Sequence, residues 1–117
     1  MKTLFPILFI LLFIFSCDDD NPVSSDLSYN DLYCSQGFVE LWGIYYDIET
    51  TTYLDLSENQ LSGIIPPHIG CLTNIDYLNL SGNQLTGVVP DEICNLEDST
   101  PNVGYNRLCP PYPECLS

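Results

Sequence analysis

Basic side chains are almost absent from this sequence. Lysine and arginine together occur twice in 117 residues, against 16 aspartates and glutamates, and the formal net charge at pH 7 is −14. Removal of residues 1–16 would delete Lys2 and no acid, so the charge would become −15 with Arg107 as the remaining basic residue. A surface of this charge repels nucleic acids and anionic lipid head groups, so neither is expected as a partner. The acidic excess is consistent with solubility, with cation binding or with a basic partner.

Catalytic and metal-binding signatures are also missing. The sequence has no GxSxG, HExxH, phosphate-loop or dinucleotide motif, and no CxxC or Cys/His spacing of the kind that holds zinc. His68 is the single histidine, and we expect it in a solvated return loop, where a general base would lack a partner. Asp55 and Glu58 lie on one exposed strand and are not an evident glycosidase pair. We therefore expect no enzyme activity, no cofactor and no metal.

The longest apolar run lies at the N-terminus. Residues 4–15 form a run of twelve residues behind the positive Lys2. It is shorter than the ~20 residues of a membrane-spanning helix and is typical of a secretory signal peptide over residues 1–16. Residues 17–33 are rich in Asp, Asn and Ser and lack apolar periodicity, which predicts a disordered acidic tether.

The junction between these two segments resembles a known processing site. Ile14-Phe15-Ser16-Cys17 resembles the lipobox of bacterial lipoproteins, although Phe15 is bulkier than the usual residue. The resemblance implies that Cys17 is acylated and anchors the mature protein in the bacterial cell envelope, at the outer membrane or cell surface. The three aspartates that follow resemble export signals of some bacterial lipoproteins. An ordinary cleaved signal and an uncleaved anchor are the alternatives.

The next part of the sequence repeats itself after 24 residues. Residues 51–74 read TTYLDLSENQLSGIIPPHIGCLTN and residues 75–98 read IDYLNLSGNQLTGVVPDEICNLED, with eleven of the 24 paired positions identical. The shared pattern, LxLxxNxLxGxxPxxIxxL, at this period is the signature of a leucine-rich repeat.

The spacing within each repeat predicts its local structure. Leu54 and Leu56 alternate with polar residues, which indicates a short strand with its leucines turned inward. Asn59 follows where the chain must turn, and its amide can bond backbone groups that have lost ladder partners. Asn83 would stack above it and form an asparagine ladder. Pro66 fixes φ on the return path, where no ladder donor is needed.

The pattern resembles the plant-type leucine-rich repeat of receptor kinases and polygalacturonase-inhibiting proteins, which repeat lipoproteins of bacteria share. The resemblance covers residues 51–98 strongly and continues more loosely to about residue 115. It implies an α/β-type repeat solenoid, a short stack with parallel strands on the concave face and mostly loop or 3-10 helix on the convex side. Family members bind proteins or glycans through the concave face.

Two caps are expected to flank the repeats. We predict an N-terminal cap over residues 34–50, two repeats over residues 51–98, and a degenerate repeat with a C-terminal cap over residues 99–117. When Asn106 is aligned with Asn83, Pro101 and a valine replace two leucines, so the array ends there. Two repeats are fewer than the three or so usually needed, which leaves open whether they suffice as a monomer.

The N-terminal cap departs from the plant-type pattern, which has two cysteines around its tryptophan. Trp42 is kept, and we expect it in the core of the cap rather than as a ligand platform. Phe38 and Tyr45 occupy plausible cysteine positions, which indicates aromatic packing in place of a disulfide. Cys34 would then lack its partner.

The cysteine count leaves one thiol over. If Cys17 carries lipid, five cysteines remain in an oxidising compartment, so one is expected to be free or to bridge two chains. The segment LCPPYPEC resembles the C-terminal cap of plant-type repeats, which implies a Cys109–Cys115 disulfide. The alignment of Asn106 with Asn83 instead places Cys115 near Cys94, so that pairing is an alternative. The connectivity of Cys34, Cys71 and Cys94 is open.

The main functional hypothesis is a lipid-anchored extracytoplasmic module that binds a protein or glycan. Its predicted ligand-binding residues are those that the strands turn toward the concave face: Tyr53, Asp55, Ser57, Tyr77, Asn79 and Ser81. Tyrosines on adjacent rungs, ~4.8 Å apart, can stack and offer amphipathic contact area. Cross-strand stabilisation alone is the competing interpretation of that pair. The alternative function is a structural envelope protein without a discrete ligand.

Overall fold

The computed structural model describes residue 17, residues 33–97 and residues 100–116. The predicted signal peptide, and the predicted tether apart from its two end residues, lie outside these ranges. The described elements are, in chain order, β1 (Phe38–Leu41), β2 (Ile44–Asp47), β3 (Tyr53–Asp55), β4 (Ser62–Gly63), η2 (Pro67–Cys71), β5 (Tyr77–Asn79), β6 (Gln84–Val88), η3 (Asp91–Asn95), β7 (Arg107–Cys109) and η4 (Glu114–Leu116), where η denotes a 3-10 helix.

An antiparallel hairpin precedes the repeats. β1 pairs with β2 through a two-residue turn, Trp42-Gly43, and both turn residues have positive φ, 47° and 84°. Such φ values match the right-handed twist of the flanking strands, which favours a tight hairpin. Val39 and Leu41 are buried, and Trp42 packs partly buried against the core. Trp42 thus contacts the core, as expected, but from the hairpin turn and only partly buried.

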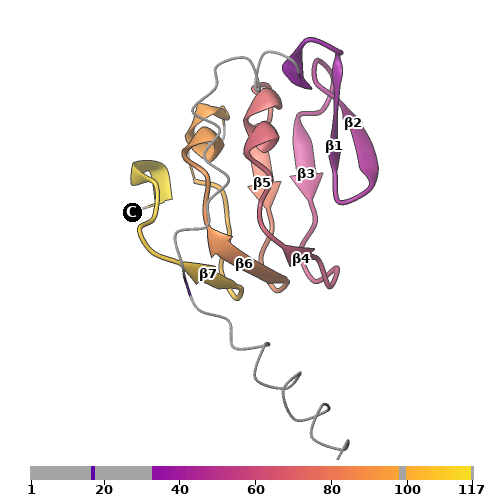
Figure 1. Ribbon diagram of the computed structural model, residues 1–117. Helices are drawn as coiled ribbons and strands as arrows, with labels where there is room; N and C mark the ends of the chain where they lie inside the picture. Colours follow the sequence, from indigo (N-terminus) through magenta and orange to yellow (C-terminus); the bar gives the residue numbers. More distant parts are fainter. Residues whose placement is uncertain (1–16, 18–32, 98–99, 117) are drawn as a thin grey trace, which may run out of the picture.

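The two repeats lie side by side with matching register. β3 and β5 are parallel, and Tyr53 pairs with Tyr77, Leu54 with Leu78 and Asp55 with Asn79. An isolated parallel bridge between Asn79 and Asn102 continues this row into the degenerate repeat. In Figure 1 the hairpin lies next to β3 at one end of the row, and β7 lies toward the other end. The parallel pairing agrees with the predicted repeat fold.

A second parallel sheet, formed by β4, β6 and β7, follows the turn that ends the first sheet in each repeat. β6 lies between β4 and β7, with Ser62 opposite Gln84 and Thr86 opposite Arg107. Gly63 and Gly87 adopt φ values of 83° and 77°, which glycine tolerates without a Cβ penalty. The chain can therefore bend at the same place in successive repeats.

The return path of each repeat is a 3-10 helix. η2 and η3 begin directly after Pro66 and Pro90, whose φ values are −66° and −68°. The two helices approach closely, because a Cβ placed on Gly70 would lie 2.7 Å from the Glu92 carbonyl oxygen. The expectation of loop or 3-10 helix on this side agrees with the structure.

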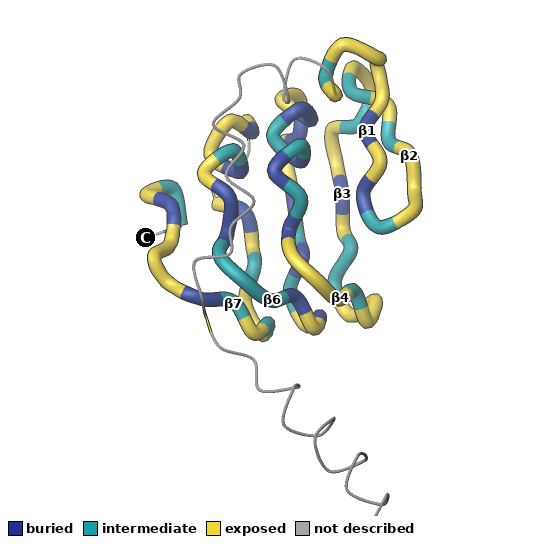
Figure 2. Tube along the Cα trace, viewed as in Figure 1, coloured by how far each residue is buried: buried dark blue, intermediate teal, exposed yellow. Residues whose placement is uncertain are grey.

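The core lies between the strands and the 3-10 helices. In Figure 2 buried positions recur in the hairpin and in each repeat, in between exposed ones. The most deeply buried side chains are aliphatic and come from the hairpin and both repeats: Val39, Leu41, Ile65, Ile69, Leu72, Ile75, Leu78, Leu80, Leu85, Val89 and Ile93. Because each repeat contributes to one shared cluster, neither repeat buries its leucines alone. Among the described residues, no helix is long and apolar enough to cross a membrane.

Asparagines tie successive turns together. Asn83 is 8 % exposed, and its Oδ1 accepts bonds from the Asn59 and Leu61 amides at 2.9 and 3.0 Å. Its Nδ2 donates to the carbonyls of Leu56 and Leu80, both at 2.9 Å. Asn106 repeats this arrangement one turn later, accepting from Leu85 and donating to Leu80. The predicted inward orientation is confirmed for Asn83, and Asn106, which the prediction did not include, adopts it as well.

Asn59 differs from the other two asparagines. It is exposed, and its side chain donates to the Ser57 carbonyl at 3.0 Å. Asn59 belongs to the first repeat. The side-chain NH₂ groups of Asn83 and Asn106 donate to a carbonyl of the preceding repeat, and Asn59 has no preceding repeat. The ladder therefore begins with the backbone of Asn59 and not with its side chain.

Candidate functional site

The six predicted ligand-binding residues lie together on one sheet face. Tyr53 and Asp55 alternate with buried Leu54 on β3, and Tyr77 and Asn79 alternate with buried Leu78 on β5. Ser57 and Ser81 follow each strand. We call these residues the exposed sheet face: Tyr53, Asp55, Ser57, Tyr77, Asn79 and Ser81. Their binding role stays a prediction, while their juxtaposition follows from the parallel register.

The two tyrosines stack on one another. Their ring centroids are 4.6 Å apart and their planes differ by 10°. The Tyr53 side chain remains 64 % exposed and that of Tyr77 38 % exposed. Stacking holds both rings in one orientation, so a partner that covers them would meet a rigid apolar surface with little rotamer entropy to lose.

After the tyrosines, β3 and β5 each end in the same small hydrogen-bonded turn. Asp55 Oδ1 accepts bonds from the Ser57 amide at 3.0 Å and the Ser57 hydroxyl at 2.6 Å. Asn79 Oδ1 accepts equivalent bonds from Ser81 at 3.1 and 2.7 Å. Asn79 Nδ2 also donates to the Tyr77 hydroxyl at 3.2 Å. The polar groups of the face are therefore fixed by their own neighbours.

Hydrogen bonds favour the ionised form of the Asp55 carboxyl group. The Ser57 hydroxyl, the Ser57 amide and, more weakly, Asn79 lower the pKa of Asp55 below its usual value of 3.8, against a smaller opposing effect of desolvation. The first and second strands thus present an anionic and a neutral side chain at equivalent positions. A basic or hydrogen-bond-donating partner would be favoured at Asp55.

One residue that sequence analysis did not select extends this row. Asn102 pairs with Asn79, and its Oδ1 accepts a bond from the Gly104 amide at 3.0 Å, as Asp55 and Asn79 do in their turns. The alignment of Asn106 with Asn83 already placed Asn102 opposite Asn79. The missing leucines of the third repeat obscured that signal.

The structure pairs all six cysteines, which corrects several predictions. The Cys109–Cys115 disulfide is wrong, since Cys115 pairs with Cys94 at a Cα–Cα distance of 5.7 Å. The reason is that η4 carries Cys115 back beside η3, which carries Cys94 (Figure 1). Cys34 pairs with Cys71 on η2, so the expectation that Cys34 lacks a partner is also wrong.

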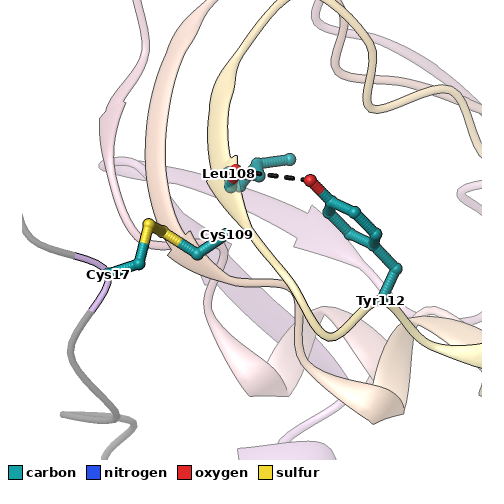
Figure 3. The surroundings of a disulfide bond; sticks show 4 residues. All are labelled: Cys17, Leu108, Cys109 and Tyr112. Carbon is teal, nitrogen blue, oxygen red and sulfur yellow. Dashed lines mark hydrogen bonds between the residues drawn. A yellow bond between two sulfur atoms is a disulfide. The ribbon is translucent and has the colours of Figure 1, made fainter.

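Cys17 occupies an unexpected position. Its sulfur bonds Cys109 at the end of β7, and no free cysteine remains in the structure (Figure 3). Tyr112 lies nearby, with its hydroxyl 3.5 Å from the Leu108 carbonyl oxygen. A sulfur in a disulfide cannot also carry a lipid through a thioether. The predicted lipidation of Cys17 and this disulfide therefore exclude one another.

The sequence predicted that His68 lies in a solvated loop, and this prediction is wrong. His68 lies in η2 and is partly buried. Its Nε2 lies 2.7 Å from the Glu40 carbonyl oxygen, and its ring stacks on Tyr33 with centroids 4.9 Å apart. Nδ1 is buried without a hydrogen-bond partner. The histidine joins η2 to the hairpin. In the described part of the chain, no His, Cys, Asp or Glu group has the arrangement of a metal site.

A comparison with models of known protein families found a match, and it lies over the repeats. A family model described as leucine rich repeat matches residues 43–85, from the hairpin turn through the start of β6. Residues 43–85 are therefore similar to a leucine-rich repeat. The match supports a leucine-rich repeat protein and, with the parallel strands, a repeat fold. Comparison with curated proteins gave no match. Leucine-rich repeats commonly bind proteins, which suggests a protein-interaction module.

Proposed function

We propose that this chain is a leucine-rich repeat module that binds a protein partner through the exposed sheet face. The stacked, exposed pair of Tyr53 and Tyr77 carries this proposal. Tyrosines with rigid, accessible rings are typical anchors of protein interfaces, because they bury a large area at small entropic cost. The carboxylate of Asp55 adds a charged group beside the rings, which would set the partner's orientation.

The proposed architecture is a short solenoid whose sheet face is concave. The parallel register of β3 and β5, the bridge from Asn79 to Asn102 and the 3-10 helices on the opposite side support it. The alternative ligand for the same face is a glycan. A structural envelope protein would need no ligand there at all.

The proposed location is extracytoplasmic. Three disulfides within one small chain support it, because disulfides persist mainly in oxidising compartments. The apolar run of residues 4–15 supports export. Anchoring at the outer membrane or cell surface through a lipid is the finer form of this proposal.

The lipid anchor requires a different state of Cys17 from the one in the structure. We propose that acylated chains carry the lipid on Cys17 and leave Cys109 as a free thiol. Cys109 is buried at the edge of the core, where an unpaired cysteine behaves as a small apolar side chain. Mass spectrometry of the membrane fraction should show an acylated Cys17 peptide and one alkylatable cysteine, Cys109. A linked Cys17–Cys109 peptide without lipid would reject the anchor.

Binding at the sheet face is tested with a partner first identified by crosslinking on whole cells. The double substitution Tyr53→Ala with Tyr77→Ala should weaken affinity by ~2 kcal/mol or more, as expected for anchor residues. Tyr45→Ala is the matched control, because Tyr45 is also 64 % exposed but lies on the hairpin. Equal loss in both variants, or unchanged affinity in a folded double variant, would favour the structural role.

A further inference from the structure

Three successive turns place a residue of positive φ at the same point of the repeat. Glu58, Gly82 and Tyr105 have φ values of 53°, 69° and 53°, and each directly precedes an asparagine of the ladder or its first turn. The Glu58 amide donates to Ser81 and the Gly82 amide to Gly104, so the turns are stacked one on the next. The three residues therefore form a short row at the edge of the repeats.

The middle position of this row has no side chain, and a hollow forms there. Its volume is about 570 Å³, and it is an open depression, because five of its six lining residues are exposed. We call it the turn notch, lined by Glu58, Gln60, Ser81, Gly82, Gln84 and Tyr105. A Cβ on Gly82 would lie 3.0 Å from Glu58 Cγ, so a side chain at this position would occupy the floor of the notch.

Tyr105 lines the turn notch. A contribution to the stability of the fold does not explain why a tyrosine occupies this position. Its side chain is 92 % exposed, so its ring adds almost nothing to the core. Its left-handed backbone suits glycine or asparagine and is disfavoured for a bulky aromatic residue. Tyr105 also lines a second, more apolar hollow of about 290 Å³, together with Leu108 and Tyr112. An accessible aromatic ring thus borders two hollows.

The polar lining of the notch suits hydroxyl groups. The carboxamides of Gln60 and Gln84 both donate and accept hydrogen bonds, as does the Ser81 hydroxyl, while Glu58 accepts. Hydroxyls of a ligand would satisfy both capacities. An ammonium or guanidinium group has no acceptor for the carboxamide NH₂ groups, and an anion would meet Glu58 and a net charge of −14.

We propose that the turn notch binds a neutral saccharide, with one sugar ring lying against Tyr105 and its hydroxyls bonded to the two glutamines and Glu58. The apolar face of a sugar ring fits a flat, exposed aromatic surface. This site lies at the turns and shares only Ser81 with the exposed sheet face. It stands independently of the protein-binding proposal.

The test is an amide NMR titration of the purified protein with cellohexaose, xylohexaose and mannohexaose. We expect saturable shifts at Gly82 and Tyr105 with at least one of these hexaoses. Tyr105→Asn keeps a residue that tolerates positive φ but removes the ring, and it should weaken affinity by at least about tenfold. Tyr105→Phe keeps the ring and should stay within about threefold of the original affinity. Tyr45→Ala removes another exposed tyrosine, which lies on the hairpin away from the notch, and should change nothing.

A second variant guards against misfolding of the first. Gly82→Asn tolerates the positive φ and fills the notch, so it should abolish the saturable shifts even if Tyr105→Asn does not fold. The proposal is overturned if no hexaose gives saturable shifts, or if folded Tyr105→Asn and Gly82→Asn bind as tightly as the original protein. Preferential binding of hexagalacturonate or tetralysine, used as charged probes, would also overturn it.

Discussion

At the scale of single residues, the exposed sheet face depends on side chains that bond their own backbone. Asp55, Asn79 and Asn102 each accept a bond from an amide two residues further on. Such bonds hold a polar group in place without burying it. The face therefore has a fixed pattern of charge and hydrogen-bonding groups even though it is solvated.

The pKa of Asp55 provides a direct measure of this arrangement. Ser57→Ala removes the hydroxyl donor that does most to lower the pKa, so the pKa should rise toward 3.8 in a carboxyl NMR titration. A lowered folded-state pKa means that the ionised carboxylate stabilises the fold above the unfolded pKa. That contribution is lost as pH falls through the folded value. The substitution should therefore make stability less sensitive to acid in that window.

Asp47 is the control for the Asp55 titration. Its pKa is also lowered, but by bonds from the Thr50 amide and hydroxyl on the hairpin. Ser57→Ala should leave the Asp47 titration unchanged. An unchanged Asp55 pKa in the variant would contradict the role assigned to the serine hydroxyl.

The asparagine ladder yields a second prediction at this scale. Asn83→Leu leaves two backbone amides and two carbonyls without their side-chain partner, and should reduce the free energy of unfolding by ~1–3 kcal/mol or more. Asn59→Leu should cost much less, because that exposed amide donates to one carbonyl. Chemical denaturation of both variants measures the difference. Equal losses would argue against the ladder geometry.

At the scale of elements, the approach of the two 3-10 helices is the tightest constraint. Gly70 lies against Glu92, with no space for a methyl group between η2 and η3. Because both helices cover the same core, separating them would also loosen the contacts of Ile69 and Ile93.

Gly70→Ala should therefore destabilise the protein, by roughly 1–3 kcal/mol as for other overpacked sites. Thermal unfolding followed by circular dichroism would measure this. Asp91→Ala is the control, since Asp91 is exposed at the start of η3. A melting temperature for Gly70→Ala equal to that of the control would show that the helices can move apart freely.

At the scale of the whole molecule, disulfides join the ends of the short array to its middle. One links Cys34, ahead of the hairpin, to η2, and another links η3 to Cys115 in η4. A small repeat array has little core to offset its loss of chain entropy, so such covalent links matter more than in a larger domain.

The Cys94–Cys115 bond is tested by removing it. The double substitution Cys94→Ser with Cys115→Ser should reduce the free energy of unfolding by ~3 kcal/mol, the scale expected for a loop of this length. Peptide mapping without reduction should find these two cysteines in one linked product. A Cys109–Cys115 product would instead restore the pairing implied by the resemblance to plant-type caps.

The sequence by itself determined the repeat, because its physical cause is local and periodic. Alternation at Leu54 and Leu56 places leucines inward, and prolines at the same point of each repeat start the 3-10 helices. The identical period then sets the parallel register that brings Tyr53 onto Tyr77. For this reason the exposed sheet face was predictable residue by residue, including the stacking of its tyrosines.

Only the tertiary structure decided contacts between segments that share no period. Cys115 meets Cys94 because the tail folds back along η3. His68 meets Tyr33 because the segment ahead of the hairpin, joined to η2 by the Cys34–Cys71 disulfide, packs on that helix. The turn notch also depends on contacts between repeats. The missing side chain of Gly82 leaves a hollow only because Glu58 and Tyr105 of the adjacent turns lie on either side of it. A linear pattern specifies the shape of each repeat, whereas these contacts depend on the free energy of packing different repeats and caps together.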